Sequence, residues 1–188
     1  LQYVEIRMLA VSQNLVAHSR LTTFGCTGTP VNVLINDLPG NVTTAGANVR
    51  WILASEPTAG AFMAAFGIAP DFTFPSGIDP ACGNVCWGAP GLLPPNPPTW
   101  DAGMPGNYVD CLAYGGYSGP LKAGQQLVAG PLGDGTQSLS RGTASGSAFT
   151  LKCPTPENNA GAVGTLASCT ASTTSSTTTT TVPPGAGI

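Results

Sequence analysis

The sequence contains very few charged residues. Among its 188 residues, only six are Lys or Arg and nine are Asp or Glu, which is 8% of the chain and gives a net charge of −3. Soluble proteins usually carry about 25% charged residues. Helical bundles and coiled coils need periodic Glu, Lys, Arg and Leu, and the composition excludes them. Six scattered cations cannot form the basic patch of a nucleic-acid-binding protein, so we expect no nucleic-acid partner.

Long apolar segments and histidine are also scarce. The longest weakly polar run, residues 59–70, is too short for a membrane span, which needs about 20 residues, so we expect none. His18 is the only histidine, and no Gly-x-Ser-x-Gly sequence is present to support a Ser-His-Asp triad. No Gly-rich phosphate loop and no closely spaced calcium-binding loop is present. We therefore expect a non-enzymatic protein with no cofactor and no metal, and we place His18 on the surface.

Glycine and proline are abundant, with 25 and 18 residues. Short alternating segments between frequent turn residues predict an all-β sandwich or barrel. A cap residue, an early proline and an alanine-rich body predict one helix within residues 55–66, ended by Gly67, that plugs one end of the sandwich. Residues 75–107 are expected to form a long Pro/Trp-rich loop, because five prolines fall within residues 90–98. The predicted strands are residues 2–8, 14–22, 31–35, 49–53, 108–114, 137–141 and 148–151.

Six cysteines indicate three disulfides and an oxidising, extracellular compartment. Zinc is the alternative, but the closest cysteine pair has three intervening residues and only one histidine is available. We predict a local Cys153–Cys169 disulfide after the last strand. The other two predicted disulfides are Cys86–Cys111, which ties the long loop to a strand, and Cys26–Cys82, which follows by elimination.

The composition changes at the C-terminal end. Residues 1–169 are expected to form the disulfide-stabilised sandwich, and residues 170–188 a Thr-, Ser- and Pro-rich tail or linker. Two interpretations of the tail remain open. It is either a flexible stalk with O-glycosylation at threonines, or a β-strand that adds to a neighbouring copy and builds a fibre. Candidate glycosylation sites are Asn41, which begins the sequon Asn41-Val42-Thr43, and Thr173, Thr174, Thr177 and Thr178.

Three short motifs resemble the lamin-tail-like domain family. Tyr3-Val4-Glu5-Ile6 is similar to an early strand of that family, and Val109-Asp110 with Ala113-Tyr114-Gly115 to a later one. Ser138-Leu139-Ser140-Arg141, followed by Phe149 and Pro154-Thr155-Pro156, is similar to its closing run. The resemblance implies an immunoglobulin-like β-sandwich that serves as a secreted interaction or surface module. The family usually has one strand before the Glu-bearing one, and lacking it would leave an open edge near the N-terminus.

Three functions are consistent with the sequence. The first is a non-enzymatic extracellular structural or interaction module at the cell surface, which associates with itself or with other cell-surface proteins, as in a surface filament. The second is a carbohydrate- or ligand-binding module that uses Trp87, Trp100, Tyr114 and Tyr117 as stacking surfaces. The third is a secreted hydrolase with a carboxylate site in or beside the long loop, for which the candidate residues are Asp71, Asp79, Asp101 and Asp110.

Overall fold

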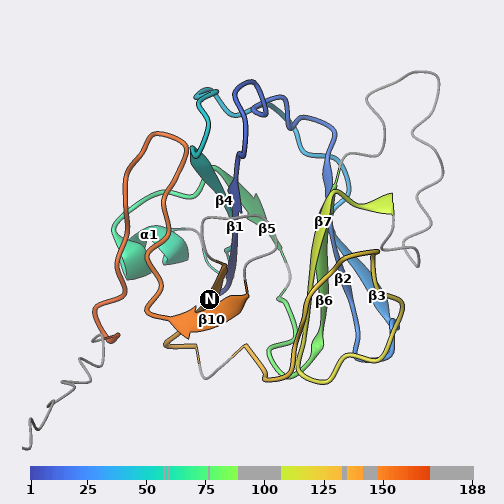
Figure 1. The fold of residues 1–188 in the computed structure, drawn as a ribbon. Coiled ribbons are helices and arrows are strands. Elements are labelled where there is room, and N and C mark those ends of the chain that lie inside the picture. Colours follow the sequence, from blue (N-terminus) through green and yellow to red (C-terminus); the bar gives the residue numbers. More distant parts are fainter. Residues whose placement is uncertain are drawn as a thin grey trace, which may run out of the picture.

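The protein is a β-sandwich of two facing sheets (Figure 1). The computed structural model describes residues 1–56, 58, 60–75, 77–88, 107–132, 135–141 and 148–169. Within these residues one sheet has three strands in the order β1-β4-β5, the second has five in the order β3-β2-β6-β7-β8, and β9 pairs with β10. The predicted all-β fold class is confirmed. The strands are β1 Tyr3–Arg7, β2 Arg20–Phe24, β3 Val31–Ile35, β4 Arg50–Ser55, β5 Phe72–Phe74, β6 Gly83–Gly88, β7 Asp110–Tyr114, β8 Leu127–Val128, β9 Ser138–Arg141 and β10 Phe149–Lys152.

The main core lies between the two sheets and is centred on Trp51 of β4, which is fully buried. Its ring meets Phe72 and Trp87 edge-on, with ring centroids 5.9 and 5.6 Å away. Because Trp87 belongs to the five-stranded sheet and Phe72 to the three-stranded one, this aromatic cluster joins the two layers. Edge-to-face pairs of this kind contribute about 0.5–1.5 kcal/mol beyond the burial of apolar area.

One short helix, α1 (Ala61–Phe66), covers the outer face of the three-stranded sheet. Its Phe62 and Phe66 pack against Ile52 of β4 and Tyr3 of β1. The Glu56 carboxylate accepts hydrogen bonds from the first N–H groups of the helix. Gly67, at φ 75°, ends the helix as predicted. The helix covers a sheet face rather than the predicted end of the sandwich, because the apolar ring of Tyr3 on β1 and Ile52 on β4 form a packing surface there.

Several strands differ from those predicted. Residues 83–88, expected to be irregular, form β6, the central strand of the larger sheet. The two glycines of β6 favour a turn in the sequence, but in the structure each lacks a Cβ where a backbone atom of another segment lies close by. A Cβ on Gly83 would lie 2.8 Å from the carbonyl oxygen of Phe24, and one on Gly88 would lie 2.8 Å from the backbone nitrogen of Val109. The second strand begins at Arg20 instead of residue 14, and the short strands β5 and β8 were not predicted.

Three disulfides stabilise the sandwich, and their pairings are those expected from the sequence. Cys26–Cys82 joins the segments after β2 and before β6, with 5.2 Å between its Cα atoms. Cys86–Cys111 links directly opposed residues of β6 and β7, and Cys153–Cys169 closes the C-terminal segment. Disulfides form and persist in oxidising compartments, so they are typical of secreted proteins.

Candidate functional site

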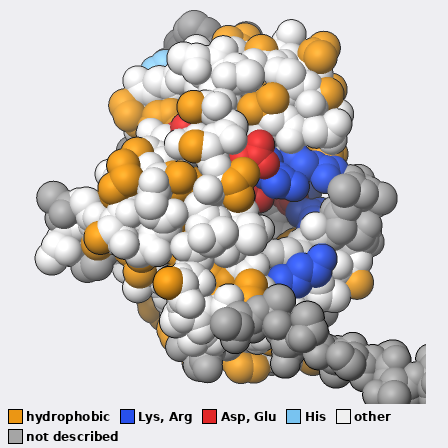
Figure 2. Space-filling view, turned by 90° about the vertical axis from the view of Figure 1, so that its left-hand side faces the viewer, with side chains coloured by type: hydrophobic (Ala, Val, Ile, Leu, Met, Phe, Trp, Pro, Cys, Tyr) orange, Lys and Arg blue, Asp and Glu red, His pale blue; other side chains and the backbone are white. Residues whose placement is uncertain are grey.

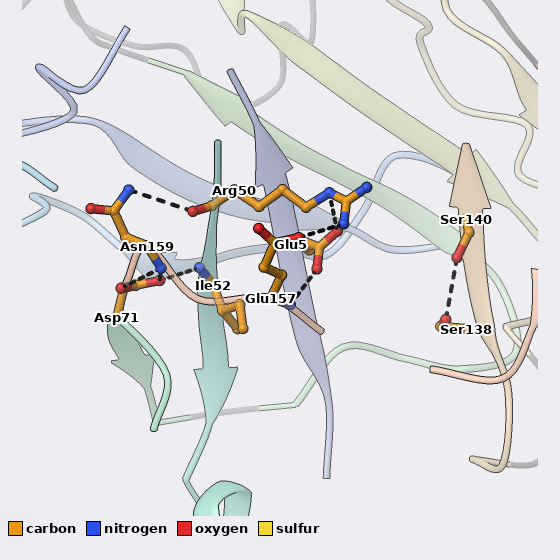
Figure 3. Close-up of polar contacts among 8 residues, drawn as sticks. All are labelled: Glu5, Arg50, Ile52, Asp71, Ser138, Ser140, Glu157 and Asn159. Carbon is orange, nitrogen blue, oxygen red and sulfur yellow. Dashed lines mark hydrogen bonds and ion pairs between the residues drawn. The ribbon is translucent and has the colours of Figure 1, made fainter. Parts of the chain in front are cut away.

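Arg50 lies at the centre of a charged cluster that fastens the C-terminal segment to the three-stranded sheet (Figure 3). Its Nη1 lies 2.8 Å from a carboxylate oxygen of Glu157, and its Nε lies 3.4 Å from one of Glu5. The second oxygen of Glu5 accepts a hydrogen bond of 2.8 Å from the backbone N–H of Glu157. Arg50 therefore connects β4, β1 and the segment after β10 at a single point.

A second group of polar contacts lies beside Arg50 and is centred on Asn159 (Figure 3). The Asn159 side chain is only 4% exposed. Its Oδ1 accepts from the backbone N–H of Thr44 at 2.7 Å and from the Thr43 hydroxyl at 3.2 Å, and its Nδ2 donates to the Thr44 carbonyl at 3.3 Å. The backbone N–H of Asn159 donates to Asp71, which also accepts from Ile52 of β4. We call the set Glu5, Arg50, Asp71, Glu157 and Asn159 the C-terminal clasp.

Burial shifts the protonation of two clasp carboxyl groups. Desolvation raises the pKa of Glu5, although the N–H of Glu157 and the charge of Arg50 act in the opposite direction. Desolvation likewise raises the pKa of Asp71, against the backbone hydrogen bonds from Ile52 and Asn159. Burial also raises the pKa of Tyr3, on the same edge strand as Glu5, to about 12. The carboxylates of Glu5, Asp71 and Glu157 are all hydrogen-bonded or ion-paired to other protein groups. The clasp therefore favours anchoring of the C-terminal segment over acid–base chemistry.

Residues 8–18, which we call the apical loop, form one end of the sandwich and lie at the top of Figure 1. The loop is anchored by Met8 and Val16, which are both buried. Between these anchors, Leu9, Val11 and Leu15 point outward and are 55%, 69% and 62% exposed. Residues 9–17 carry no charged side chain. The loop therefore presents three aliphatic side chains to solvent on a neutral background.

The apical loop is held in one conformation by an internal hydrogen-bond frame. Gln13 Oε1 accepts from the N–H groups of Leu9 and Ala10, at 2.6 and 3.0 Å. Asn14 exchanges bonds with the backbone of Val42, and the N–H of Ser12 donates to Ala45. The loop is thus tied to itself and to the neighbouring loop of residues 36–49, which fixes the directions of its exposed side chains.

Two of the four predicted stacking residues are wrongly assigned. Tyr114 and Tyr117 are only 1% and 4% exposed, so neither can serve as a stacking surface. Tyr114 fills the main core, and the Tyr117 hydroxyl donates to the carbonyl of Pro120. Trp87 is half-buried: its ring packs on Trp51, and its Nε1–H donates to Ser19. Trp100 lies outside the described residues.

The predicted carboxylates have separate structural partners. Asp71 belongs to the clasp, Asp79 accepts from the N–H of Ala81 two residues later, and Asp110 forms an ion pair with Arg141. Asp101 lies outside the described residues. Within the described part of the chain, no group of three or more His, Cys, Asp or Glu side chains could hold a metal ion. The described carboxylates are therefore used in turns, ion pairs and backbone contacts.

The remaining predicted positions lie on the surface or in the tail. His18 is exposed, and its Nδ1 lies 2.9 Å from a carboxylate oxygen of Asp37. Asn41 of the sequon is exposed, and its Oδ1 accepts from the N–H of Ala17. The candidate threonines at 173, 174, 177 and 178 lie outside the described residues. No helix in the described part of the chain is long and apolar enough to cross a membrane.

The surface reflects the low charge of the chain. On the face seen in Figure 2, acidic and basic side chains meet in one mixed group with a separate basic patch below it, and most of the remaining surface is apolar or uncharged. Comparison of the chain with protein-family models, curated proteins and solved structures finds no match. The lamin-tail-like resemblance and the immunoglobulin-like strand arrangement therefore remain predictions.

The apical loop was missed from the sequence because residues 14–22 were assigned to a strand. One signal could have found it. If one strand continued from residue 2 to residue 22, its opposite face would carry Leu9, Val11 and Leu15, so they would not continue the face of Val4, Ile6 and Met8. The intervening residues Ser12, Gln13 and Asn14 favour a turn. An apolar segment interrupted by turn residues indicates a loop that exposes some of its apolar side chains.

Proposed function

We propose that this chain is a non-enzymatic extracellular module that binds other protein molecules, including further copies of itself, through the apical loop. The observation that carries the proposal is the outward placement of Leu9, Val11 and Leu15 on a hydrogen-bonded frame. Apolar groups clustered on an exposed surface mark interaction sites. A frame that already holds them in place lowers the entropy lost on binding.

The disulfides and the low charge support the same proposal. Three disulfides suit a protein that works outside the cell, where the oxidising environment maintains them. A net charge of −3 on 188 residues gives little repulsion between copies that come into contact. We place the module at the cell surface or in the secreted fraction. In this proposal residues 1–169 form the module and residues 170–188 its tail, with Asn41 and the tail threonines as glycosylation candidates.

The two alternative functions have less support. A carbohydrate-binding face built on aromatic side chains loses Tyr114 and Tyr117 to the interior. A hydrolase would need carboxylates that face a substrate, whereas Asp71, Asp79 and Asp110 each bind a protein group. Binding through the apical loop requires neither exposed aromatic rings nor free carboxylates, so we favour a protein-binding module.

The test removes apolar character from the loop without touching its frame. In the full chain, Leu9→Ser, Val11→Ser and Leu15→Ser are combined, and self-association is measured by sedimentation velocity over a range of concentrations. The control makes serine substitutions at three exposed aliphatic residues elsewhere, Leu121, Leu127 and Leu151, which are 46%, 48% and 45% exposed. We expect the loop variant to associate more weakly than the control, with both keeping the unfolding temperature of the wild type.

A photo-crosslinking residue placed at Val11 gives a second readout. We expect it to join two copies more efficiently than the same residue placed at Val163, which is 57% exposed in the C-terminal segment. Equal association of the loop variant and the control, together with equal crosslinking at the two positions, would refute the proposal.

A further inference from the structure

Strand β3 is an edge of the five-stranded sheet. It pairs with β2 on one side, and within the described residues no strand lies on its other side. Val31 and Val33 are each 37% exposed, and the strand Val-Asn-Val-Leu-Ile carries no charge. Natural sheets commonly protect such an edge with lysine, an internal proline or a cover. The sequence of β3 contains neither lysine nor proline.

The register shows which backbone groups of β3 face outward. The N–H of Gly25 donates to the carbonyl of Pro30, and the pairing continues through Phe24↔Val31, Thr23↔Asn32 and Thr22↔Val33. In an antiparallel ladder, hydrogen-bonded pairs alternate with non-bonded pairs. Thr23↔Asn32 is therefore a bonded pair, and the N–H and C=O groups of Val31 and Val33 point away from β2.

The side chains of Val31 and Val33 lie next to a buried apolar cluster of the same sheet. Phe24 and Thr22 stand opposite Val31 and Val33, and residues directly opposed across a ladder lie on the same face of the sheet. Phe24 belongs to a buried cluster on the outer face of this sheet, together with Cys86 and Tyr108. An added strand would gain hydrogen bonds to the outward-facing backbone groups of Val31 and Val33 and would place its side chains beside these two exposed valines.

The chain itself contains a suitable added strand. Residues 173–182 read Thr-Thr-Ser-Ser-Thr-Thr-Thr-Thr-Thr-Val, have no charge and are mostly β-branched. Such residues favour extended strands, and Pro183-Pro184 would end the pairing. Backbone hydrogen bonds supply the affinity in strand addition, so a sequence of low complexity is no obstacle.

Geometry favours a second copy as the source of that strand. The described chain ends at Cys169, on the side of the molecule opposite β3 (Figure 1). A domain of this size has a half-circumference of about 60 Å. Residues 170–182 span at most about 43 Å when fully extended. The segment falls short of the β3 edge of its own molecule but can reach that of a neighbour.

We propose that the β3 edge of one molecule binds residues 173–182 of a second copy as an added β-strand. The inference rests on the proposed self-association and adds a second, separate interface to it. Donor and acceptor lie on different surfaces, so the contact repeats head to tail and leads to an open chain of molecules.

The test uses two full-length variants, each blocked on one side of the contact. Val33→Pro removes an outward N–H that pairs with nothing in β2, so it blocks the edge while keeping the β2–β3 ladder. Thr177→Pro with Thr178→Pro prevents the tail from pairing on either face. Their controls are Val33→Thr and Thr177→Val with Thr178→Val, which keep every N–H and the β-branched shape. Circular dichroism and thermal unfolding verify that each variant is folded.

Sedimentation velocity decides between the outcomes. We expect each proline variant alone to raise the dissociation constant of self-association about tenfold or more, and the controls to behave as the wild type. When both proline variants also carry the Leu9, Val11 and Leu15 serine changes, which remove apical-loop association, their mixture retains one intact edge and one intact tail, so it should form a one-to-one dimer and nothing larger. The Leu9, Val11 and Leu15 serine variant should keep this tail-dependent association, which separates the two interfaces.

Three results would overturn the inference. Unchanged association of Val33→Pro would show that the edge is not used. A mixture that forms no dimer would show that edge and tail do not meet. A wild type that is always monomeric, but is less stable to heat in both proline variants, would show that the tail binds its own molecule. Loss of association only in the apical-loop variant would retain the proposed function and reject the β3 contact.

Discussion

The side chain of Asn159 should be one of the strongest polar contributions to the stability of the fold. Replacing it with alanine removes the bonds of 2.7 and 3.2 Å to the Thr43–Thr44 turn and the bond of 3.3 Å to the Thr44 carbonyl. Each typical hydrogen bond contributes about 0.5–1.5 kcal/mol, and leaving a partner unsatisfied adds to the loss. The turn is near solvent, so water replaces part of what is lost. We expect Asn159→Ala to lower the free energy of unfolding by about 2–3 kcal/mol.

The neighbouring asparagine provides a matched control. Asn158 also makes two side-chain bonds, of 3.1 Å to the Ala69 carbonyl and 3.0 Å from the N–H of Ala162, but both are exposed to solvent. We expect Asn158→Ala to cost less than about 1 kcal/mol. The backbone N–H of Asn159 keeps its bond to Asp71 in both variants, so the comparison isolates the side chain.

Guanidinium unfolding at neutral pH, with the disulfides intact, measures both variants through tryptophan fluorescence, to which Trp51 and Trp87 of the core contribute. The midpoint should fall for Asn159→Ala without a change in the slope. Asn159→Asp tests the same site through the pH dependence of stability. A carboxylate placed there lies in a buried site beside Asp71, so this variant should recover stability as the pH falls. The reasoning is refuted if Asn159→Ala is no less stable than Asn158→Ala, or if Asn159→Asp is insensitive to pH.

Three further predictions follow from the described contacts. Burial raises the pKa of Glu5 above its ordinary value of 4.5, so the folded state binds a proton more readily than the unfolded state. The contribution of Glu5 to stability therefore falls as the pH rises from 4.5 through the pKa of the folded state. Over this pH interval, the free energy of unfolding should fall less steeply for Glu5→Gln than for the wild type. Gly116→Ala should cost only the left-handed backbone strain, about 1 kcal/mol, whereas Gly115→Ala adds a clash with a backbone oxygen 1.9 Å away and should be markedly less stable in thermal unfolding. Replacing Cys26 and Cys82 by alanine opens the loop of longest separation, 56 residues, and should cost about 4 kcal/mol, more than opening the disulfide with a separation of 16 residues; equal losses in guanidinium unfolding would contradict the chain-entropy explanation.

The fold class was predictable because alternation and turn residues are local signals. Val31–Ile35 was predicted with its observed bounds, and the end of α1 at Gly67 follows from a single residue type. β6 was missed because its two glycines serve close contacts with distant residues, Phe24 and Val109. A local sequence pattern contains no information about such contacts.

The candidate surfaces depend even more on distant parts of the chain. The C-terminal clasp joins Glu5 and Arg50 to Glu157, and Asp71 to Asn159, across separations of up to 152 residues. No local sequence pattern relates residues so far apart in the chain. Sequence reasoning assigned Tyr114 to a stacking surface, whereas the structure places its ring in the main core.

The clasp also has a consequence for assembly. Asn159 and the Cys153–Cys169 disulfide fix the place where the chain leaves the sandwich, and Figure 1 shows that this place lies across the molecule from β3. A tail that left near β3 could pair with its own edge and would close the molecule as a monomer. In the proposed assembly, a tail fixed on the opposite side would pair with the β3 edge of a neighbour instead. The polar contacts that stabilise the C-terminal segment thereby also set the direction in which an added strand would connect one molecule to the next.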